Sequence, residues 1–360
     1  MLTGIPCTIM RGGTSKGLYF HAADLPTDRE LRDRVLLAAM GSPDARQIDG
    51  LGGAHPLTSK VAVVSRSTRA DADVDYLFLQ VVVDRAAVSD SQNCGNLLAG
   101  VGPWAIESGL VTVNADITPV RIHMVNTGSL AVAYVRTPQG AVEYEGDARI
   151  DGVPGTAAPI DLEFLDVAGA SCGSLLPTGA VTDSFEGLQV TCIDNGMPVI
   201  IVRAADLAVS GSETPAQLEA NDVLKARVEK LRLALGLRMN LGDVTRKTVP
   251  KVCLVSAARR GGAIATATFI PHRVHEAIGV LGAVSVATAC VIPGTVAASM
   301  AHTGATRGRI DVEHPSGFFT VDVAVNPGPP VTVSKAVLLR TARKLMRGHL
   351  FVPGSVWSRA

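Results

Sequence analysis

The sequence has little of what marks several common classes of protein. Its six cysteines are scattered over 360 residues without a CxxC pair, so neither a disulfide framework nor a zinc site is predicted. A reducing, cytoplasmic environment fits this usage. Aromatic residues make up only 4% of the chain, so the core is expected to consist mainly of Ala, Val, Leu and Ile.

Neither sign of charge predominates in the chain. Lys and Arg together number 33, as do Asp and Glu, and no basic cluster has aromatic residues interleaved with it. Nucleic acids and anionic membranes are therefore not expected as partners. No secretory signal is recognisable at the N-terminus, and the longest uncharged run, 277–292, is shorter than the roughly 20 residues needed to span a bilayer. These absences favour a small molecule as the ligand.

One stretch organises the rest of the chain. The residues Ser-Gln-Asn-Cys-Gly-Asn at 91–96 precede an uncharged run at 97–106, which predicts a buried helix opened by Cys94. Asn93 is the expected N-cap, and the amides that follow it would lie at the positive end of the helix dipole. Because Gly95 has no side chain, an anion could approach those amides, and the same turn could lower the pKa of the thiol. A small buried cysteine with only a packing role fits the local sequence equally well.

A polar glycine turn lies near the start of the chain. Strands are predicted at 8–10 and 18–21, with Arg-Gly-Gly-Thr-Ser-Lys-Gly at 11–17 between them. This is a hairpin whose loop could hold an anion, although a surface hairpin with incidental charges is an alternative. It is not a Walker loop, because Lys16 precedes the last glycine and no helix follows.

Further elements follow from hydrophobic patterning and from helix-end signals. A helix is expected at 28–40, ending at Gly41. Lys60 precedes a strand at 61–65, and a lysine in such a place is usually a surface residue. A charged helix is expected at 215–235, with most of its charges in solvent. The remaining strands are predicted at 74–84, 120–124, 130–137 and 142–146.

The second half of the chain replays the first in order. Residues 191–202 resemble the opening hairpin, and 248–256 echo 57–65. A second uncharged helix is expected from about residue 277. This order argues for duplication, with one domain at 1–168, completed by 335–360, and a second at 169–334. A cleft where the two helix N-termini face each other would suit a polyanionic ligand.

The second half also contains cationic and imidazole side chains. His272, Arg273 and His275 precede the second helix, where they could reach ligand carboxylates. A metal is not expected, because neither HExxH nor a carboxylate set accompanies the two histidines. The segment 313–317, Glu-His-Pro-Ser-Gly, offers His314, although an ordinary turn is an alternative there. No GxSxG elbow supports Ser-His-Asp hydrolysis.

Five segments taken together resemble a known family. In chain order they are 11–17, 58–61, 92–96, 194–198 and 313–317, and they resemble the PrpF family, most of all its 4-oxalomesaconate tautomerase/isomerase branch. The resemblance covers essentially the whole chain. It implies an α+β, diaminopimelate-epimerase-like fold of two pseudo-symmetric domains. Each domain would be a β-barrel-like sheet wrapped around a central helix, with the active site between the domains.

The resemblance also implies the chemistry. In the epimerases both central helices begin with a cysteine, but here the second helix has none near residues 278–280, and Cys290 lies about three turns further on. Two-thiol racemisation is therefore not expected. The family's lysine corresponds to Lys60, which would act as the general base, with Cys94 as thiol donor or proton relay. The reverse assignment of these two catalytic residues stays open.

The expected function is that of a cofactor-independent isomerase acting on 4-oxalomesaconate through an enolate, in the catabolism of protocatechuate or gallate. The alternatives are an aconitate-type isomerase of the methylcitrate cycle and a non-catalytic tricarboxylate-binding module. No cofactor or metal is expected, the partner is a small tricarboxylate, and a homodimer is left open. The residues expected to bind the substrate are Thr14, Ser15, Asn93, Gly95, Asn96, His272, Arg273 and His314.

Overall fold

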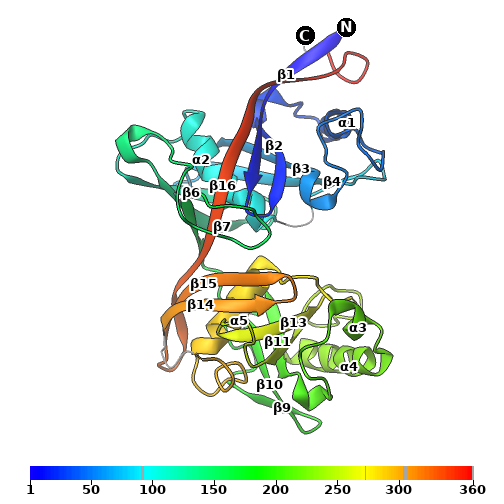
Figure 1. The fold of residues 1–360 in the computed structure, drawn as a ribbon, viewed down its shortest axis with the longest axis vertical. Coiled ribbons are helices and arrows are strands. Elements are labelled where there is room, and N and C mark those ends of the chain that lie inside the picture. The colour runs from blue at the N-terminus through cyan, green and yellow to red at the C-terminus, as the bar shows by residue number, and fades with distance from the viewer. Residues whose placement is uncertain (91–92, 272, 303–306, 359–360) are drawn as a thin grey trace. The chain divides into compact units, whose positions relative to one another are not determined.

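The computed structural model describes residues 1–90, 93–271, 273–302 and 307–358 (Figure 1). The chain divides into two compact units. Unit 1 comprises residues 1–165 and 339–360, and unit 2 comprises residues 166–338. Among the described helices, none combines the length and the apolar character required to cross a membrane.

Unit 1 is built mainly from strands, with two helices. The helices are α1 (Arg29–Met40) and α2 (Gly95–Glu107), and short 3-10 turns lie at Ala22–Asp24, Pro56–Thr58 and Pro138–Gly140. The strands are β1 (Leu2–Gly12), β2 (Ser15–His21), β3 (Lys60–Arg66), β4 (Val74–Val81), β5 (Val88–Ser89), β6 (Ile117–Met124), β7 (Ser129–Arg136) and β8 (Pro159–Leu165). The second half of the long C-terminal strand β16 (Thr332–Pro353), residues 342–353, pairs with β1.

Unit 2 is likewise built from strands and a few helices. Its helices are α3 (Pro215–Glu219), α4 (Asp222–Arg238) and α5 (Val280–Val291), with a 3-10 turn at Ala205–Leu207. Its strands are β9 (Asp183–Phe185), β10 (Leu188–Asp194), β11 (Pro198–Arg203), β12 (Lys251–Ser256), β13 (Ile264–Phe269), β14 (Arg307–His314) and β15 (Gly317–Asn326). The first residues of β16 pair with β15.

The two units share one order of strand pairing. In unit 1, β1 and β2 form an antiparallel hairpin, β2 pairs in parallel with β3, and β3 is antiparallel to β4. The chain then passes through α2 before β6 pairs in parallel with β4. In unit 2, β10, β11, β12, β13, α5 and β14 repeat each of these steps. The pairing confirms the duplication expected from the sequence.

Each unit contains one helix that is almost free of charge, α2 in unit 1 and α5 in unit 2 (Figure 1). Apart from Asn96 and Glu107 of α2, the side chains of both helices are apolar, small or hydroxylated, and most of them are buried. A helix with no polar face must be surrounded by protein, and here strands surround it. The predicted helices at 97–106 and from about 277 are thus confirmed, and the fold is of the expected α+β class.

Helix-end signals in the sequence were informative for α1. Asp28 caps its N-terminus by accepting a hydrogen bond from the Leu31 amide at 2.8 Å, and Gly41 ends it in the left-handed conformation with φ 75°. At α2 the expected cap is wrong by one residue. Cys94, and not Asn93, is the N-cap, and its Sγ accepts the Leu97 amide hydrogen at 3.5 Å.

Two predicted elements differ from the structure. Residues 142–146, expected as a strand, form an irregular segment, and the next strand is β8. The helix expected at 215–235 is broken at Ala220, because Asn221 caps a new helix by accepting the Leu224 amide hydrogen at 3.0 Å. Within that new helix Arg232 is completely buried, which contradicts the expected solvated position of its charge.

Candidate active site

The tip of the β1–β2 hairpin packs directly on the first turn of α2. A Cβ atom added to Gly12 would lie 2.5 Å from the Asn96 carbonyl oxygen, and one added to Gly13 would lie 2.3 Å from Asn96 Oδ1. Only glycine fits so close an approach. The Asn96 amide then donates a hydrogen bond to Thr14 Oγ1 at 3.0 Å. Two predicted binding residues, Thr14 and Asn96, are therefore brought together by this contact.

Lys60 lies at the start of β3, beside the same hairpin. Its register partner in β2 is Gly17, and a Cβ on Gly17 would lie 2.5 Å from the Lys60 carbonyl oxygen and 3.1 Å from Leu97 Cδ2 of α2. The general expectation that a lysine at such a place is a surface residue is wrong here, because Lys60 is only 6% exposed. The end of the hairpin thus joins the predicted base to the helix that begins after Cys94.

A glutamine that the sequence reading missed holds the Lys60 side chain. Lys60 Nζ donates to Oε1 of Gln80 at 2.6 Å and lies 4.9 Å from the centre of the Phe78 ring. The Gln80 amide nitrogen donates in turn to the carbonyl oxygens of Ser59 at 2.9 Å and Pro56 at 3.1 Å. These bonds fix which end of the Gln80 amide faces the lysine. The only signal in the sequence was a polar residue within an otherwise apolar part of β4.

Cys94 is 9% exposed and its backbone is held by a buried phenol. Tyr76 donates to the Cys94 carbonyl oxygen at 3.3 Å, and Tyr19 donates to the Leu97 carbonyl oxygen at 2.6 Å. Burial, followed by the electrostatic influence of Cys94, raises the pKa of both tyrosines well above the ordinary value. Both phenols therefore remain neutral donors that fix the first turn of α2 around the thiol.

Three buried polar atoms at the hairpin tip and at the start of α2 lack a hydrogen-bond partner within the described chain. They are the hydroxyl of Ser15, which is 2% exposed, and the Oδ1 atoms of Asn93 and Asn96. The Asn93 amide nitrogen is already engaged with Thr127 Oγ1 at 2.5 Å. An unsatisfied buried polar atom costs roughly 1–3 kcal/mol. Their clustering at predicted binding residues, next to Gly95, is what a site for a polar ligand requires.

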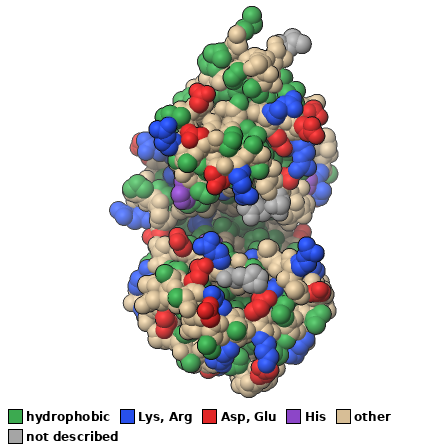
Figure 2. Space-filling model, turned by 90° about the vertical axis from the view of Figure 1, so that its right-hand side faces the viewer, with side chains coloured by type: hydrophobic (Ala, Val, Ile, Leu, Met, Phe, Trp, Pro, Cys, Tyr) green, Lys and Arg blue, Asp and Glu red, His purple; other side chains and the backbone are tan. Residues whose placement is uncertain are grey.

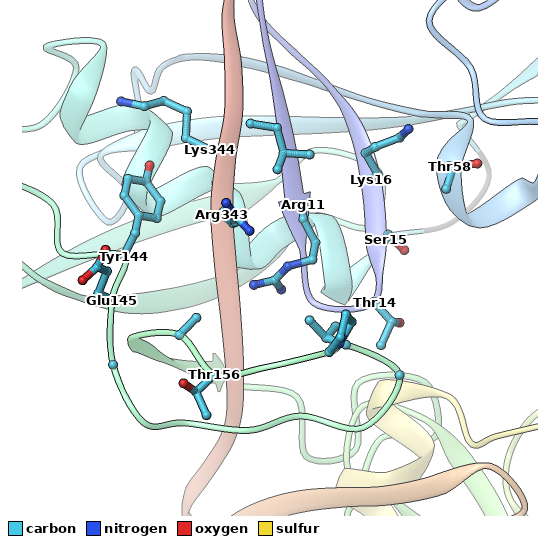
Figure 3. Close-up of a pocket in the computed structure, with 16 residues that line it drawn as sticks. Arg11, Thr14, Ser15, Lys16, Thr58, Tyr144, Glu145, Thr156, Arg343 and Lys344 are labelled. Carbon is cyan, nitrogen blue, oxygen red and sulfur yellow. The ribbon is translucent and has the colours of Figure 1, made fainter.

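A cavity of about 820 Å³ lies in unit 1 beside this hairpin. It is lined by Thr14 and Ser15 at the hairpin tip, by the start of β2, by residues 343–345 of β16 and by parts of the segment 144–157 (Figure 3). Its size lies within the range of small-molecule pockets. Lys60 and Cys94 are not among its lining residues.

The predicted binding residues of unit 2 have different surroundings. Arg273 lies on the surface with its side chain 80% exposed, and its Nε donates to Glu219 Oε1 at 3.1 Å. His272 lies outside the described residues. His275 accepts the Ala277 amide hydrogen at 2.9 Å, and burial, together with the charge of Lys251, lowers its pKa. His275 is therefore neutral near pH 7 and does not supply a cation.

His314 ends β14 and is 7% exposed. Its Nδ1 lies 3.3 Å from the Ser316 hydroxyl, and its ring centre lies 5.8 Å from that of Phe319. The preceding residue, Glu313, is 2% exposed, and its carboxylate accepts hydrogen bonds from the backbone amides of Arg259, Arg260 and Gly262. The segment 313–317 is thus anchored within unit 2 by a buried carboxylate.

The start of α5 lacks the thiol found at the start of α2. Its N-cap is Gly279, which makes no side-chain cap, and Cys290 lies in the last turn. Burial raises the pKa of Cys290, so its thiol stays protonated. Within the described ranges, no group of three or more His, Cys, Asp or Glu side chains is placed to hold a metal ion.

Comparison with known proteins assigns the chain to a family. The model of the PrpF protein family matches residues 2–353. The chain is 60% identical to the 4-oxalomesaconate tautomerase of Pseudomonas putida over 99% of this chain and 98% of that protein. It is also 60% identical to the (4E)-oxalomesaconate Delta-isomerase of Novosphingobium sp. strain KA1, over 96% of this chain and 97% of that protein.

Solved structures agree with this assignment. A crystal structure of methylitaconate-delta-isomerase matches with a TM-score of 0.90 and 37% identity, and the match covers 100% of this chain and 98% of that one. A probable proline racemase from Agrobacterium radiobacter matches with a TM-score of 0.51 at 13% identity, covering 96% and 92% of the two chains, and so shares the fold. The chain therefore belongs to the PrpF family, and it is an isomerase.

Proposed function

We propose that the protein isomerises 4-oxalomesaconate by removing a proton from one carbon atom and returning a proton elsewhere on the resulting enolate, without a cofactor. The observation that carries the proposal is the placement of a buried lysine and a buried thiol around one glycine hairpin, in a chain 60% identical to two proteins named for oxalomesaconate isomerisation. The reaction would belong to the catabolism of protocatechuate or gallate.

Lys60 is the proposed base. Removal of a proton from carbon requires its amine form, and the acceptor at its Nζ is the neutral amide oxygen of Gln80. No carboxylate of the described chain forms an ion pair with Lys60 that would hold the ammonium form. The burial of Lys60 and its neutral hydrogen-bond partner support its proposed role as general base.

Cys94 is the proposed proton donor or relay. A thiolate beside Lys60 would stabilise the ammonium form of the lysine and so weaken it as a base. We therefore assign the neutral amine form to Lys60 and the protonated thiol form to Cys94. The amides at the start of α2 can stabilise negative charge on the enolate, because they lie at the positive end of the helix dipole. Gly95 leaves their approach open.

The proposed carboxylate-binding residues remain those named from the sequence. Thr14 and Ser15 lie at the hairpin tip and Asn96 bonds to Thr14, while Asn93 lies just before the N-cap of α2. Unpartnered polar atoms of Ser15, Asn93 and Asn96 support the assignment. His314 and Arg273 are proposed from unit 2, together with His272. The ion pair of Arg273 with Glu219 would have to open for that role, which makes Arg273 the weakest member of the set.

Solvent exchange tests the proposal. The purified protein is incubated in deuterated water with 4-oxalomesaconate and, separately, with an aconitate-type acid, and deuterium incorporation is followed by NMR. Incorporation into oxalomesaconate alone is the expected result. Incorporation into the aconitate alone would make the protein an aconitate-type isomerase. Activity that is lost on prolonged chelation and restored by a divalent ion would contradict the cofactor-free mechanism.

A further inference from the structure

Three positively charged side chains occupy one row across three neighbouring strands of unit 1. Lys16 of β2 is the register partner of Arg11 in β1, and Arg11 is the register partner of Arg343 in β16. Register partners in antiparallel strands project to the same face of a sheet. Lys16, Arg11 and Arg343, which we call the cation row, therefore share one face.

The cation row faces away from the proposed catalytic residues. The adjacent register pair, Gly12 and Ser15, projects to the opposite face. On that face a Cβ at Gly12 would touch the first turn of α2. The hairpin therefore has two sides. One side packs against the helix that begins after Cys94, and the other presents the three cations, while the tip residues Thr14 and Ser15 border the same cavity as the cations.

The cation row borders the cavity described above (Figure 3). Two further charged side chains line this cavity, Lys344 and Glu145. Lys344 is neutralised by Glu107, whose Oε1 lies 2.7 Å from its Nζ. Among the described residues none forms an ion pair with a member of the cation row, so at least two positive charges remain uncompensated beside Glu145.

This arrangement is unfavourable without an anion. Like charges directly opposite each other on a sheet destabilise it. The guanidinium of Arg11 cannot easily move away, because its Nη1 donates to the carbonyl oxygens of Gly13 at 2.9 Å and Thr341 at 3.0 Å. Burial, and then the positive charge of Arg343, lowers the pKa of Arg11. A bound oxyanion would offset the repulsion and accept charge-assisted hydrogen bonds from the same groups.

We infer that the cavity bordered by Lys16, Arg11 and Arg343 is an anion subsite, which binds a small, multiply charged oxyanion next to the hairpin tip at Thr14 and Ser15 and apart from Lys60 and Cys94, which do not line it. Carboxylates and phosphates share the chemistry that the cation row recognises. The inference depends on the register and on the cavity, and it stands whether or not oxalomesaconate is the substrate.

Calorimetric titration of the full chain at low ionic strength tests the inference, with citrate and inorganic phosphate as separate probes. Lys16→Gln and Arg343→Gln each remove one cation from the row. Arg347→Gln is the matched control, because Arg347 is an exposed cation of the same strand outside the cavity. Either probe is expected to bind the native protein and the control alike. The dissociation constant should rise at least tenfold, or about 1.4 kcal/mol, in the two row variants.

The outcomes separate the sources of the anion. Binding of citrate without phosphate identifies a polycarboxylate ligand, and binding of phosphate identifies a phosphate-bearing one. Equal binding by all four proteins, or binding of neither probe at millimolar concentration, would overturn the inference.

Thermal unfolding provides a second measurement that does not depend on choosing the right ligand. Without added anion, Arg343→Gln should unfold at a temperature equal to or above that of the native protein, because it removes repulsion. A lower melting temperature for this variant than for Arg347→Gln would show that the native row is already compensated and would also overturn the inference.

Discussion

The Nζ atom of Lys60 lies 2.6 Å from Oε1 of Gln80, and the two residues face each other in register across β3 and β4. Gln80 cannot rotate freely, because its amide nitrogen donates to the carbonyl oxygens of Pro56, Ser59 and Val81. The position of the proposed base is therefore set by a neutral side chain. Gln80 is a positioning residue in this scheme, since it acts through Lys60.

Two substitutions of Gln80 should distinguish its effect on the position of Lys60 from its effect on the charge of Lys60. We expect Gln80→Leu to lower kcat about tenfold or more, because Lys60 loses the acceptor that holds it. Gln80→Glu should be inactive near neutral pH and regain activity at higher pH, because a carboxylate stabilises the ammonium form. The measurement is the pH profile of kcat for the three proteins. An identical profile for Gln80→Glu and the native enzyme would contradict the role of Lys60 as base.

The division of labour between Lys60 and Cys94 predicts unequal effects. Lys60→Met removes the base, so kcat should fall by the roughly 10²–10⁴-fold typical of general acid-base catalysis. Cys94→Ser keeps a hydroxyl at the N-cap of α2, so it should retain a larger share of activity. Solvent deuterium exchange is followed in both variants side by side. Loss of exchange in Cys94→Ser with exchange kept in Lys60→Met would reverse the two roles.

The buried carboxylate of Glu313 predicts a pH dependence of stability. Burial alone would raise its pKa, but hydrogen bonds from the amides of Arg259, Gly262 and Arg260 outweigh it and lower the pKa below the ordinary value of about 4.5. A carboxyl whose pKa is lower in the folded chain stabilises the fold above that ordinary value. This stabilisation is lost as the pH falls through the folded pKa.

Glu313→Gln should therefore be less stable than the native protein at pH 7, by about 1–3 kcal/mol. The difference should shrink as the pH is lowered below about 4.5. Urea unfolding at a series of pH values measures both effects. A constant difference between pH 7 and pH 3 would show that the carboxylate charge contributes nothing.

Substitution of Arg232 should lower the free energy of unfolding strongly and have little direct effect on catalysis. It is fully buried, its Nε and Nη2 donate to the two carboxylate oxygens of Glu229 at 2.7 Å, and its Nη1 donates to the Val244 carbonyl oxygen at 2.8 Å. Breaking such a pair costs roughly 3–5 kcal/mol. Arg232→Met should show this loss in denaturant unfolding. Arg227→Met, an exposed arginine of the same helix, should change stability by less than about 0.5 kcal/mol.

The sequence predicted best where local chemistry decides the structure. The uncharged runs form the buried helices α2 and α5, because such runs have no charged face to expose to solvent. The ends of α1 were predicted correctly, because Asp28 and Gly41 end the helix through hydrogen bonds to residues close in sequence. The repeated order of hairpin, strand pair and helix could also be predicted, because each of these elements has a local sequence pattern. These features fix the fold class without knowledge of distant contacts.

The predictions were wrong where contacts with residues distant in the sequence determine the local structure. Residues 142–146 alternate like a strand but find no strand partner, and a Cβ on Gly146 would instead lie 2.7 Å from the Cα of Ala158. Arg232 looks like a surface charge until the carbonyl oxygen of Val244, twelve residues away, is placed beside it. The one sequence signal of Gln80, a polar residue in an apolar part of β4, does not show its role, because that role depends on Lys60 in the neighbouring strand.

Strand β16 has a consequence for how the molecule is made. It supplies the partner of β1, so Leu2 pairs with Pro353 and Gly12 with Ala342. A ribosome therefore releases the first strand more than 300 residues before its partner exists, while residues 166–338 form a continuous stretch that can close earlier. Until β16 has been made, one edge of β1 stays open to pairing with another chain. Unit 1, whose first strand is made before any residue of unit 2, is therefore completed only after unit 2 has been made.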